Sequence, residues 1–301
     1  MENTSSRPSA APHVALVGVQ IFFGSLPVIG KVVLKVLPPL ALVGFRVGIT
    51  AALLAIVQAY RGRFWLKDRK DYFKLGMLSL FGVTFNQLLF VSGLSLTKAS
   101  NTSLLAVTIP IFALTVSSIA GTEALRGAKV IGIVLAAIGV ILLIDPRQAS
   151  FSSLTTIGDI LIVLNSLSYG IYVATSKETI TRNGAFRSMM WVFIFASIVC
   201  VPLGVHSLSS VDLNAVTPLI WGLVIYIAIG ATASPYILNA WALARVSPST
   251  VAVYVYLQPL IGFLCAVIFL GEKIDLRFAA AAILIFIGVY FVTKRHEVAL
   301  G

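Results

Sequence analysis

Charged side chains are scarce in this sequence: Asp, Glu, Lys and Arg make up 11% of the 301 residues, whereas hydrophobic residues make up 58%. Because soluble domains usually contain about 25% charged residues, this composition excludes an ordinary soluble protein. Residues 75–97, 99–122, 213–244 and 246–271 contain no charge, and each run is long enough to cross a bilayer as a helix. The alternating segments of about ten residues expected of a membrane β-barrel are missing. We therefore expect an all-α integral membrane protein.

Groups suited to catalysis or metal binding are also few. The sequence has two cysteines and three histidines, and His13, His206 and His296 are expected at helix ends or in the tails. It has no HExxH, CxxC, GxSxG or P-loop motif. All eleven acids are expected in loops or near helix ends, which would leave an intramembrane enzyme no buried acid to use. We therefore expect no enzymatic activity, no cofactor and no metal site.

The apolar pattern predicts ten transmembrane helices in two sets of five. Their expected ranges are 12–31, 38–60, 72–96, 100–120, 128–145, 157–177, 187–206, 216–241, 247–270 and 276–294. The first five form residues 12–145, the last five form residues 157–294, and 146–156 is an external linker. Residues 1–11 and 295–301 are expected to be cytoplasmic tails.

The two sets of helices repeat one another. Pro110 and Pro259, Glu123 and Glu272, and Gly139 and Gly288 are each 149 residues apart, while Gly24 and Gly170, and Lys31 and Lys177, are each 146 apart. Because each repeat has an odd number of spans, the second must insert upside down relative to the first. Two inverted five-helix repeats of this kind are an architecture of secondary transporters, in which the halves rock around a central site.

The distribution of Lys and Arg predicts the orientation, since cytoplasmic loops hold the excess of positive charge. With the N-terminus inside, most of the 22 Lys and Arg residues lie in cytoplasmic segments, and Arg46 lies within a span. Both termini are then cytoplasmic. The net charge of +11 is scattered over many loops, which favours contact with lipid headgroups over nucleic-acid binding.

Several short motifs form a recognisable set. They are Phe23-Gly24-Ser25 with Lys31, Phe45-Arg46, Ala99-Ser100-Asn101 before Pro110, and Gly121-Thr122-Glu123, with echoes at Ser247, Pro259 and Leu270-Gly271-Glu272-Lys273. As a set they resemble EamA-type transporters of the drug/metabolite transporter (DMT) superfamily over nearly the whole chain. The resemblance implies ten helices, both termini inside, and movement of small metabolites, often amino acids and usually outward. Two departures, Phe23 where many relatives have Trp and no counterpart of Arg46 in the second repeat, prevent the resemblance from naming a substrate.

Uncharged polar and aromatic side chains share faces of the predicted spans. Asn165, Tyr169 and Tyr172 are spaced i, i+4, i+7, and Tyr254 and Gln258 are spaced i, i+4. Amides at membrane depth are expected to face the bundle interior, either around a substrate or as hydrogen bonds between helices with no ligand. The predicted cavity residues are Gln20, Arg46, Asn86, Gln87, Asn165, Tyr169, Tyr172, Tyr236, Asn239, Tyr254 and Gln258.

Prolines within spans mark expected helix breaks. Each removes a backbone hydrogen bond, and in a membrane the freed carbonyl must find protein, water or ligand. A single proline is more often a packing kink, but the matched pair Pro110 and Pro259 favours a hinge or cavity lining. The predicted hinge or break residues are Gly24, Pro27, Pro110, Pro235 and Pro259.

These features predict a bacterial inner-membrane carrier that works by alternating access. A nearly uncharged, aromatic and amide-rich site suits amino acids with apolar side chains better than phosphorylated sugars. The alternative is a non-transporting membrane protein, either a lipid-handling component or a scaffold. Since no acid is expected at membrane depth to couple flux to protons, facilitated diffusion or exchange is predicted. The expected partners are the small-molecule substrate and the lipid bilayer, with the chain present as a monomer or homodimer.

Overall fold

The computed structural model describes residues 10–144, 155–211, 213, 216–270 and 276–294, and these fold into helices and short connections. The α-helices are α1 (Ala11–Val33), α2 (Pro39–Tyr60), α3 (Arg69–Ser79), α4 (Phe85–Leu96), α5 (Ala99–Leu105), α6 (Thr108–Ile119), α7 (Gly127–Ile144), α8 (Thr156–Asn183), α9 (Ala185–Ser207), α10 (Pro218–Ala228), α11 (Ser234–Leu243), α12 (Pro248–Val253), α13 (Leu257–Leu270) and α14 (Leu276–Thr293). Two π-helical turns, η1 (Leu80–Thr84) and η5 (Ile229–Ala233), and two 3₁₀ turns, η3 (Leu208–Ser210) and η6 (Tyr254–Tyr256), complete the described elements. The predicted tails, most of the predicted linker and Glu272 lie outside the described residues.

Each predicted span lies mostly on helical residues of the described chain. Eight stretches are long and apolar enough to cross a membrane, including α3–η1–α4 and α10–η5–α11. The predicted ninth span is divided into α12, η6 and α13, and the tenth is α14. The prediction of 157–177 was too short, because α8 continues to Asn183 and ends where Gly184 adopts a φ of +82°. That conformation is one that glycine adopts without steric cost.

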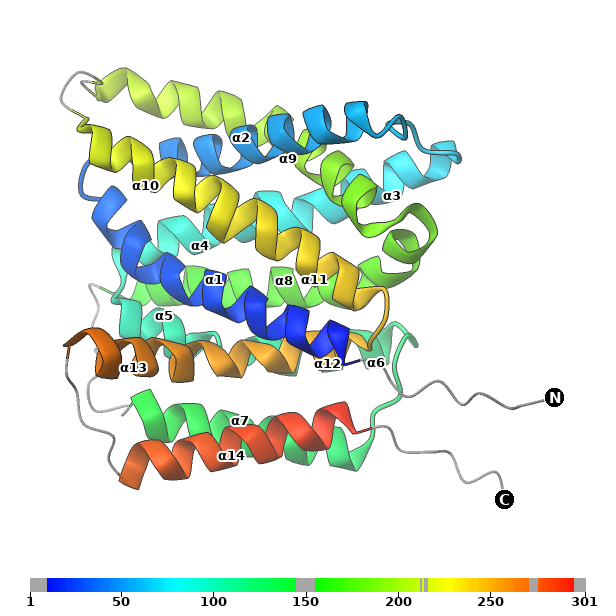
Figure 1. The fold of residues 1–301 in the computed structure, drawn as a ribbon, viewed down its shortest axis with the longest axis vertical. Helices are drawn as coiled ribbons and strands as arrows, with labels where there is room; N and C mark the ends of the chain where they lie inside the picture. Colours follow the sequence, from blue (N-terminus) through cyan, green and yellow to red (C-terminus); the bar gives the residue numbers. More distant parts are fainter. Residues whose placement is uncertain (1–9, 145–154, 212, 214–215, 271–275, 295–301) are drawn as a thin grey trace.

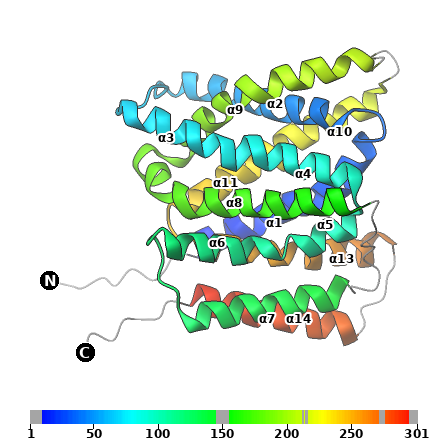
Figure 2. The ribbon, with the colours of Figure 1, turned by 180° about the vertical axis from the view of Figure 1, so that it is seen from behind.

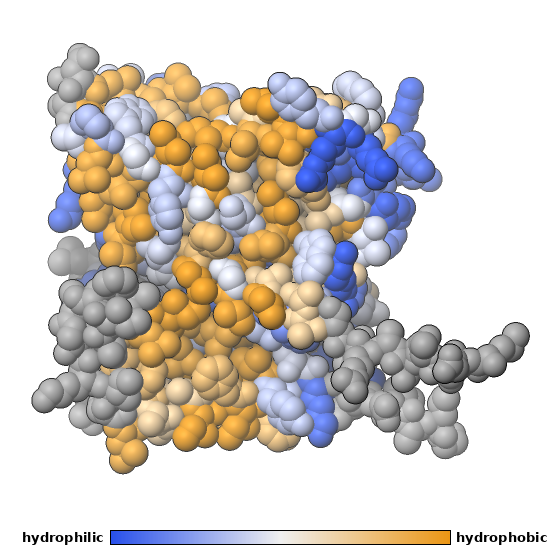
Figure 3. Space-filling view, viewed as in Figure 1, coloured by the Kyte–Doolittle hydropathy of each residue, from blue (hydrophilic) through white to orange (hydrophobic). Residues whose placement is uncertain are grey.

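The helices run side by side across the molecule, and successive spans alternate in direction (Figures 1 and 2). The start of α1 and the end of α14 lie on the same side (Figure 1); we call this side the terminal face and the other side the opposite face. Hydrophobic side chains cover the middle of the molecule, and strongly hydrophilic ones gather at the terminal face (Figure 3). This surface fits a bilayer, and the chain is a multi-pass membrane protein.

The two halves interlock through equivalent helices. α1 of the first half packs against α11 and α13 of the second, and α8, its counterpart, packs against α4 and α6 of the first. The pairs α2 with α9 and α7 with α14 also join equivalent helices. Each half therefore completes its packing with the first helix of the other, so that neither is a separate folding unit.

Contacts between equivalent residues locate a pseudo-two-fold axis between the halves. The amide of Gln87 donates to the hydroxyl of Tyr236, 149 residues away, at 3.0 Å. The hydroxyl of Tyr256 donates to the carbonyl of Val107, also 149 residues away, at 2.9 Å. A side chain can bond its own repeat counterpart only close to the symmetry axis, so these two bonds place the axis in the middle of the bundle.

The helices α7 and α14 meet through small residues at symmetric positions. A Cβ atom added at Gly132 would lie 2.6 Å from the carbonyl oxygen of Gly288, and one added at Gly139 would lie 2.8 Å from the carbonyl oxygen of Ala281. Since Ala281 is 149 residues after Gly132 and Gly288 is 149 residues after Gly139, the two contacts are equivalent under the repeat. Small residues allow such close backbone approach between membrane helices.

Two acids in the first turns of helices are buried, which corrects the expectation that no buried acid exists. Asp71 of α3 is 1% exposed, and it accepts hydrogen bonds from Arg182 Nε at 3.0 Å and from Asn183 at 2.7 Å. Asp159 of α8 is 8% exposed and accepts a bond from the Thr97 hydroxyl at 2.6 Å. Both do lie near helix ends, as predicted, but neighbouring helix ends cover them. Each is supplied with donors, as burial of a carboxylate requires.

Glu123, in the connection between α6 and α7, joins the two halves at the terminal face. It accepts hydrogen bonds from the backbone N–H of Ser249 at 3.0 Å and from the Ser249 hydroxyl, and it pairs with Lys129. Ser249 lies in the first turn of α12, where helical N–H groups lack intrahelical partners. Burial alone would raise the pKa of the Glu123 carboxyl, but the Lys129 ammonium and the Ser249 donors together hold that pKa below its ordinary value of 4.5.

We predict that Gly132→Ala destabilises the protein, because the added methyl group overlaps the α14 backbone and such overpacking costs about 1–3 kcal/mol. The thermal unfolding midpoint in detergent should fall by several degrees. Gly222→Ala in α10 is the matched control, since nothing lies within 4 Å of its Cβ position; it should leave the midpoint unchanged or slightly higher. Equal midpoints for the two variants would contradict the close packing of α7 on α14.

We predict that Glu123 stabilises the fold at neutral pH and ceases to do so in acid. Because its pKa is lower in the folded protein than the unfolded value near 4.5, its contribution is complete above that value and is lost as pH falls through the lower folded pKa. The stability difference between wild type and Glu123→Gln, measured by thermal unfolding from pH 7 to pH 3, should shrink in that range. A difference that stays constant or grows towards pH 3 would exclude this ionic role.

Candidate functional site

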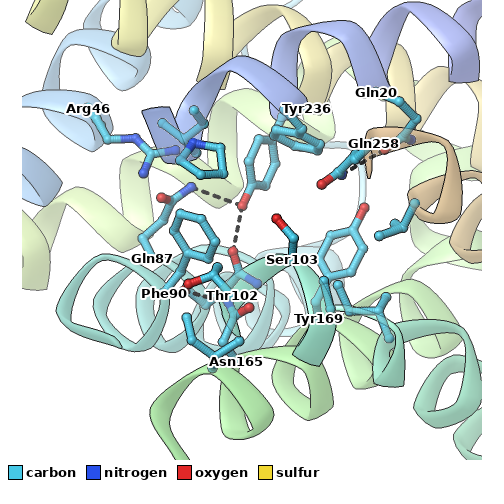
Figure 4. A pocket seen from close by; sticks show the side chains of 18 residues that line it. Gln20, Arg46, Gln87, Phe90, Thr102, Ser103, Asn165, Tyr169, Tyr236 and Gln258 are labelled. Atoms are coloured by element: carbon cyan, nitrogen blue, oxygen red, sulfur yellow. Dashed lines mark hydrogen bonds between the residues drawn. The ribbon is translucent and has the colours of Figure 1, made fainter. Parts of the chain in front are cut away.

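A cavity lies where the two halves meet, and its empty space, counted up to the protein atoms and including open solvent at its mouth, is about 760 Å³. Its polar side chains project towards one another from several helices (Figure 4). The lining residues are Gln20, Phe23, Leu26, Pro27, Arg46, Asn86, Gln87, Phe90, Thr102, Ser103, Ala106, Ile109, Ile162, Asn165, Tyr169, Tyr236, Val255 and Gln258.

The π-helical turn η5 positions the charged residue of this cavity. Thr232 in that turn donates its hydroxyl hydrogen to the carbonyl of Ile227 at 2.7 Å and accepts a hydrogen bond from Arg46 Nε at 3.0 Å. The hydroxyl of Thr50, one turn after Arg46 on α2, donates to the carbonyl of Ala228 at 2.9 Å. A π-turn alters the regular backbone bonding of the helix. Here Arg46 of α2 bonds a residue of the turn, and Thr50 of α2 bonds the residue just before the turn.

The equivalent turn η1, 149 residues earlier, positions Tyr236. The Tyr236 hydroxyl lies 2.9 Å from the carbonyl of Gly82 in that turn, 3.0 Å from Asn86 Oδ1 and 3.0 Å from the donating amide of Gln87. Phe23 of α1 packs edge-on against the Tyr236 ring, with 6.0 Å between the ring centroids. The two π-turns thus act on opposite halves: η5 holds Arg46 of the first half, and η1 holds Tyr236 of the second.

Amide groups form the other side of the cavity. Asn165 of α8 donates to the backbone carbonyl of Asn86 at 2.8 Å, and Gln258 of α13 donates to Gln20 of α1 at 2.8 Å. Tyr169 lines the cavity, with its hydroxyl hydrogen-bonded by Asn239 from behind. The first two bonds join one half to the other, whereas the bond between Asn239 and Tyr169 lies within the second half. The cavity wall is therefore itself an interface between the halves.

Two lysines at equivalent positions bond backbone carbonyls at opposite faces. Lys31 donates to the carbonyl of Thr97 at 2.6 Å, at the opposite face, and Lys177 donates to the carbonyl of Val246 at 2.7 Å, at the terminal face. Thr97 and Val246 are 149 residues apart and each precedes the first residue of a short helix by two positions. The symmetry of the repeat therefore extends from the cavity to both ends of the bundle.

Eight of the eleven predicted cavity residues line the cavity: Gln20, Arg46, Asn86, Gln87, Asn165, Tyr169, Tyr236 and Gln258. Pro27, predicted as a helix break, lines it as well. Tyr172 and Tyr254 instead turn away, with the Tyr172 hydroxyl 3.4 Å from the Met189 sulfur and the Tyr254 hydroxyl 2.7 Å from His13 Nδ1. Asn239 lies behind Tyr169. Gly24 lies against the Gln258 backbone.

The predicted helix breaks are close to real ones. In the first half, α5 ends at Leu105 and α6 begins at Thr108, two residues before Pro110. In the second half, α12 is followed by η6, which ends at Tyr256, and α13 begins at Leu257, two residues before Pro259. The Ala106 carbonyl, which Pro110 cannot bond, accepts from Ile109 N–H at 3.0 Å. Pro235 is the second residue of α11, two positions after η5 ends, whereas Pro27 lies inside the continuous helix α1.

The sequence interpretation missed the contribution of α5 and much of the apolar lining. Thr102 and Ser103 reach the cavity because α5 ends early, close to the middle of the bundle. The polar run at 99–103, which lies ahead of Pro110 in the sequence, could have indicated that this segment lines the cavity. Phe23, Leu26, Phe90, Ile109 and Ile162 supply the apolar lining, and their positions in apolar helices do not distinguish them from lipid-facing residues.

Known proteins resemble the chain over almost its whole length. An uncharacterized transporter of Archaeoglobus fulgidus is 27% identical over 95% of this chain and 98% of its own. An uncharacterized transporter of Bacillus subtilis is 21% identical over 93% and 96%, and a WAT1-related protein of Arabidopsis thaliana is 27% identical over 75% and 68%. One crystal structure matches with a TM-score of 0.76 and 17% identity, over 95% of this chain and 98% of its own, and so shares the fold.

The model of the EamA-like transporter family matches this chain twice, at residues 11–145 and 156–294. The two matches coincide with the two halves that meet at the cavity. The chain belongs to the EamA-like transporter family.

Proposed function

We propose that this protein is a secondary carrier that moves small amphipathic organic solutes, in particular amino acids with apolar side chains, by alternating access. The observation behind this proposal is the central cavity, which both inverted halves line and which the pseudo-two-fold axis passes close to. A site in that position can be opened to either side by rocking one half against the other. In the cell, the proposed location is a bacterial inner membrane with the terminal face in the cytoplasm, and the proposed direction is outward.

The chemistry of the lining supports this substrate class. Amides, hydroxyls and aromatic rings surround the space together with aliphatic side chains, and Arg46 is the only charged residue among the described residues that line it. A phosphorylated sugar would favour several cationic groups. The lining holds no carboxylate, imidazole or thiol, which favours a carrier over an enzyme.

Contacts between the halves at each face identify what must open. At the terminal face, Glu123 of the first half bonds Ser249 of the second. At the opposite face, Asp159 of the second half accepts bonds from Thr97 and Asn101 of the first. Alternating access requires these two sets of contacts to break in turn, because both close the interface in which the cavity lies.

We predict that Asn165→Ala and Gln258→Ala each reduce leucine flux about tenfold in proteoliposomes at subsaturating substrate. Each removes an amide of the cavity wall that bonds to the other half, and losing such a group costs roughly 1–2 kcal/mol. Thr175→Ala is the matched control, since that side chain is exposed on the outer surface of α8 and its loss should not change the rate. Wild-type flux in both cavity variants would mean that the substrate path lies elsewhere. Absence of flux for any amino acid in wild type would favour the lipid-handling or scaffold alternative.

We predict that a pH gradient does not drive accumulation of leucine. The cavity lining contains no group that titrates in the physiological range, so net flux should follow the leucine gradient alone, as facilitated diffusion or exchange. Proteoliposomes with equal leucine on both sides and a pH gradient of either sign should show no sustained uptake. Sustained accumulation would contradict this, and its loss in Asp159→Asn or Glu123→Gln would then identify the proton site.

A further inference from the structure

We propose that Arg46 forms an anion-binding subsite of the central cavity and that the solute which binds there carries a single carboxylate. This inference deepens the proposed function, and it is framed so that binding can be tested apart from transport.

Arg46 is buried without a counter-ion in the part of the chain that the structure describes. Its side chain is 1% exposed, and it is the largest of the fully buried side chains. Its Nε atom donates to Thr232, while Nη1 is buried and has no hydrogen-bond partner. An unpaired buried charge costs several kcal/mol, and arginine cannot avoid this cost by losing its proton.

The buried acids of the described chain are all engaged elsewhere. Asp71 is held by Arg182 and Asn183, Asp159 by Thr97 and Asn101, and Glu123 by Lys129 and Ser249. These three carboxylates lie at the ends of the bundle, whereas Arg46 lies about two turns inside α2. The described chain therefore offers no carboxylate to pair with the guanidinium.

Arg46 forms part of the cavity wall. Arg46 lines the cavity beside Gln87, with Gln20, Gln258 and Tyr169 across the space from it (Figure 4). A carboxylate in the cavity can accept a charge-assisted hydrogen bond from the guanidinium, and this bond is stronger than one between neutral groups. Among the described residues, the one hydrogen bond to the Arg46 side chain runs from Nε to Thr232; it fixes the side chain and leaves Nη1 without a partner.

The rest of the lining limits what the carboxylate can be attached to. A single cation matches a single negative charge, which disfavours dicarboxylates and phosphates. Phe23, Leu26, Phe90 and Ile109 provide an apolar surface for the body of the ligand. The best-fitting ligand is thus a monocarboxylate with an apolar body, and any second polar group it has would meet uncharged amides.

A purely structural arginine would have a different environment. Buried charges that only hold helices together are normally paired and fully hydrogen-bonded. Arg46 has one bond and one unsatisfied nitrogen, so its replacement by an apolar side chain should leave the empty protein as stable as wild type or more stable. Arg46 is therefore expected to destabilise the protein when no ligand is bound. This is the behaviour of a charged group that finds its counter-ion and its remaining hydrogen bonds only in a bound ligand.

The test is binding to the purified full-length protein in detergent, with four probes of similar shape: L-leucine, L-leucinamide, 4-methylpentanoate and 3-methylbutylamine. The wild type should bind the two carboxylates, leucine and 4-methylpentanoate, and should bind leucinamide and 3-methylbutylamine at least tenfold more weakly. Arg46→Gln and Arg46→Met should weaken both carboxylates at least tenfold, and Arg46→Lys should weaken them less. Arg69→Gln, which removes an exposed arginine at the start of α3, is the matched control and should change nothing.

Thermal unfolding of the empty variants accompanies the binding measurements. Arg46→Met should unfold at the wild-type temperature or above it, and the carboxylates should raise the midpoint of wild type but not of this variant. The proposal is overturned if no probe binds in an Arg46-dependent way, if leucinamide binds wild type as well as leucine, or if Arg46→Gln keeps the carboxylate preference.

Flux measurements separate this inference from the proposed function. Arg46-dependent binding of leucine without flux in proteoliposomes would support the subsite and contradict transport. Leucine flux with an unchanged KM in Arg46→Gln would support transport and contradict the subsite.

Discussion

The structure depends on one constraint: inside a bilayer, every backbone polar group that leaves a regular helix must find a partner within the protein or a ligand. This chain interrupts its helices at matched positions, at η1 and η5 and again before Pro110 and Pro259. Side chains on other helices meet the irregular backbone, as Tyr236 does at Gly82 and Tyr256 does at Val107. Because the breaks come together near the pseudo-two-fold axis, the polar groups of a substrate site collect there while the lipid-facing surface stays apolar.

The same breaks explain how one polar cavity is compatible with a stable apolar bundle. The outer pairs, α2 with α9 and α7 with α14, are continuous helices that pack closely, in the second pair through Gly132 and Gly288. The irregular spans lie between these pairs (Figure 1), with one face towards the cavity and apolar side chains such as Phe85 and Ile229 on the outer surface. Each of these pairs joins one helix of each half, so the boundary between the halves runs through both pairs and through the cavity, and the contacts of Glu123 and Asp159 lie at its two ends.

The sequence predicted the repeat and the class of protein because these depend on composition and on residue offsets, which need no knowledge of packing. It also indicated the cavity amides, since polar groups within apolar segments must face inward. It failed where local geometry departs from the regular helix. The spacing of Tyr254 and Gln258 implied a shared face, but the 3₁₀ turn η6 between them changes the rotation per residue, and Tyr254 faces His13. The π-turns have no reliable sequence signature, and the burial of Asp71 and Asp159 at helix ends depends on neighbours far along the chain.

The central claim is that the cavity opens alternately to the two faces. The most direct measurement is side-specific labelling of a single cysteine at Ser103, which lines the cavity, in a chain whose Cys200 and Cys265 are replaced by alanine. An impermeant thiol reagent would be applied to right-side-out and to inverted vesicles, each with and without saturating leucine. The account predicts that the cysteine reacts from either side and that leucine shifts the two rates in opposite directions. Reaction from one side alone under every condition, or equal shifts on both sides, would contradict it.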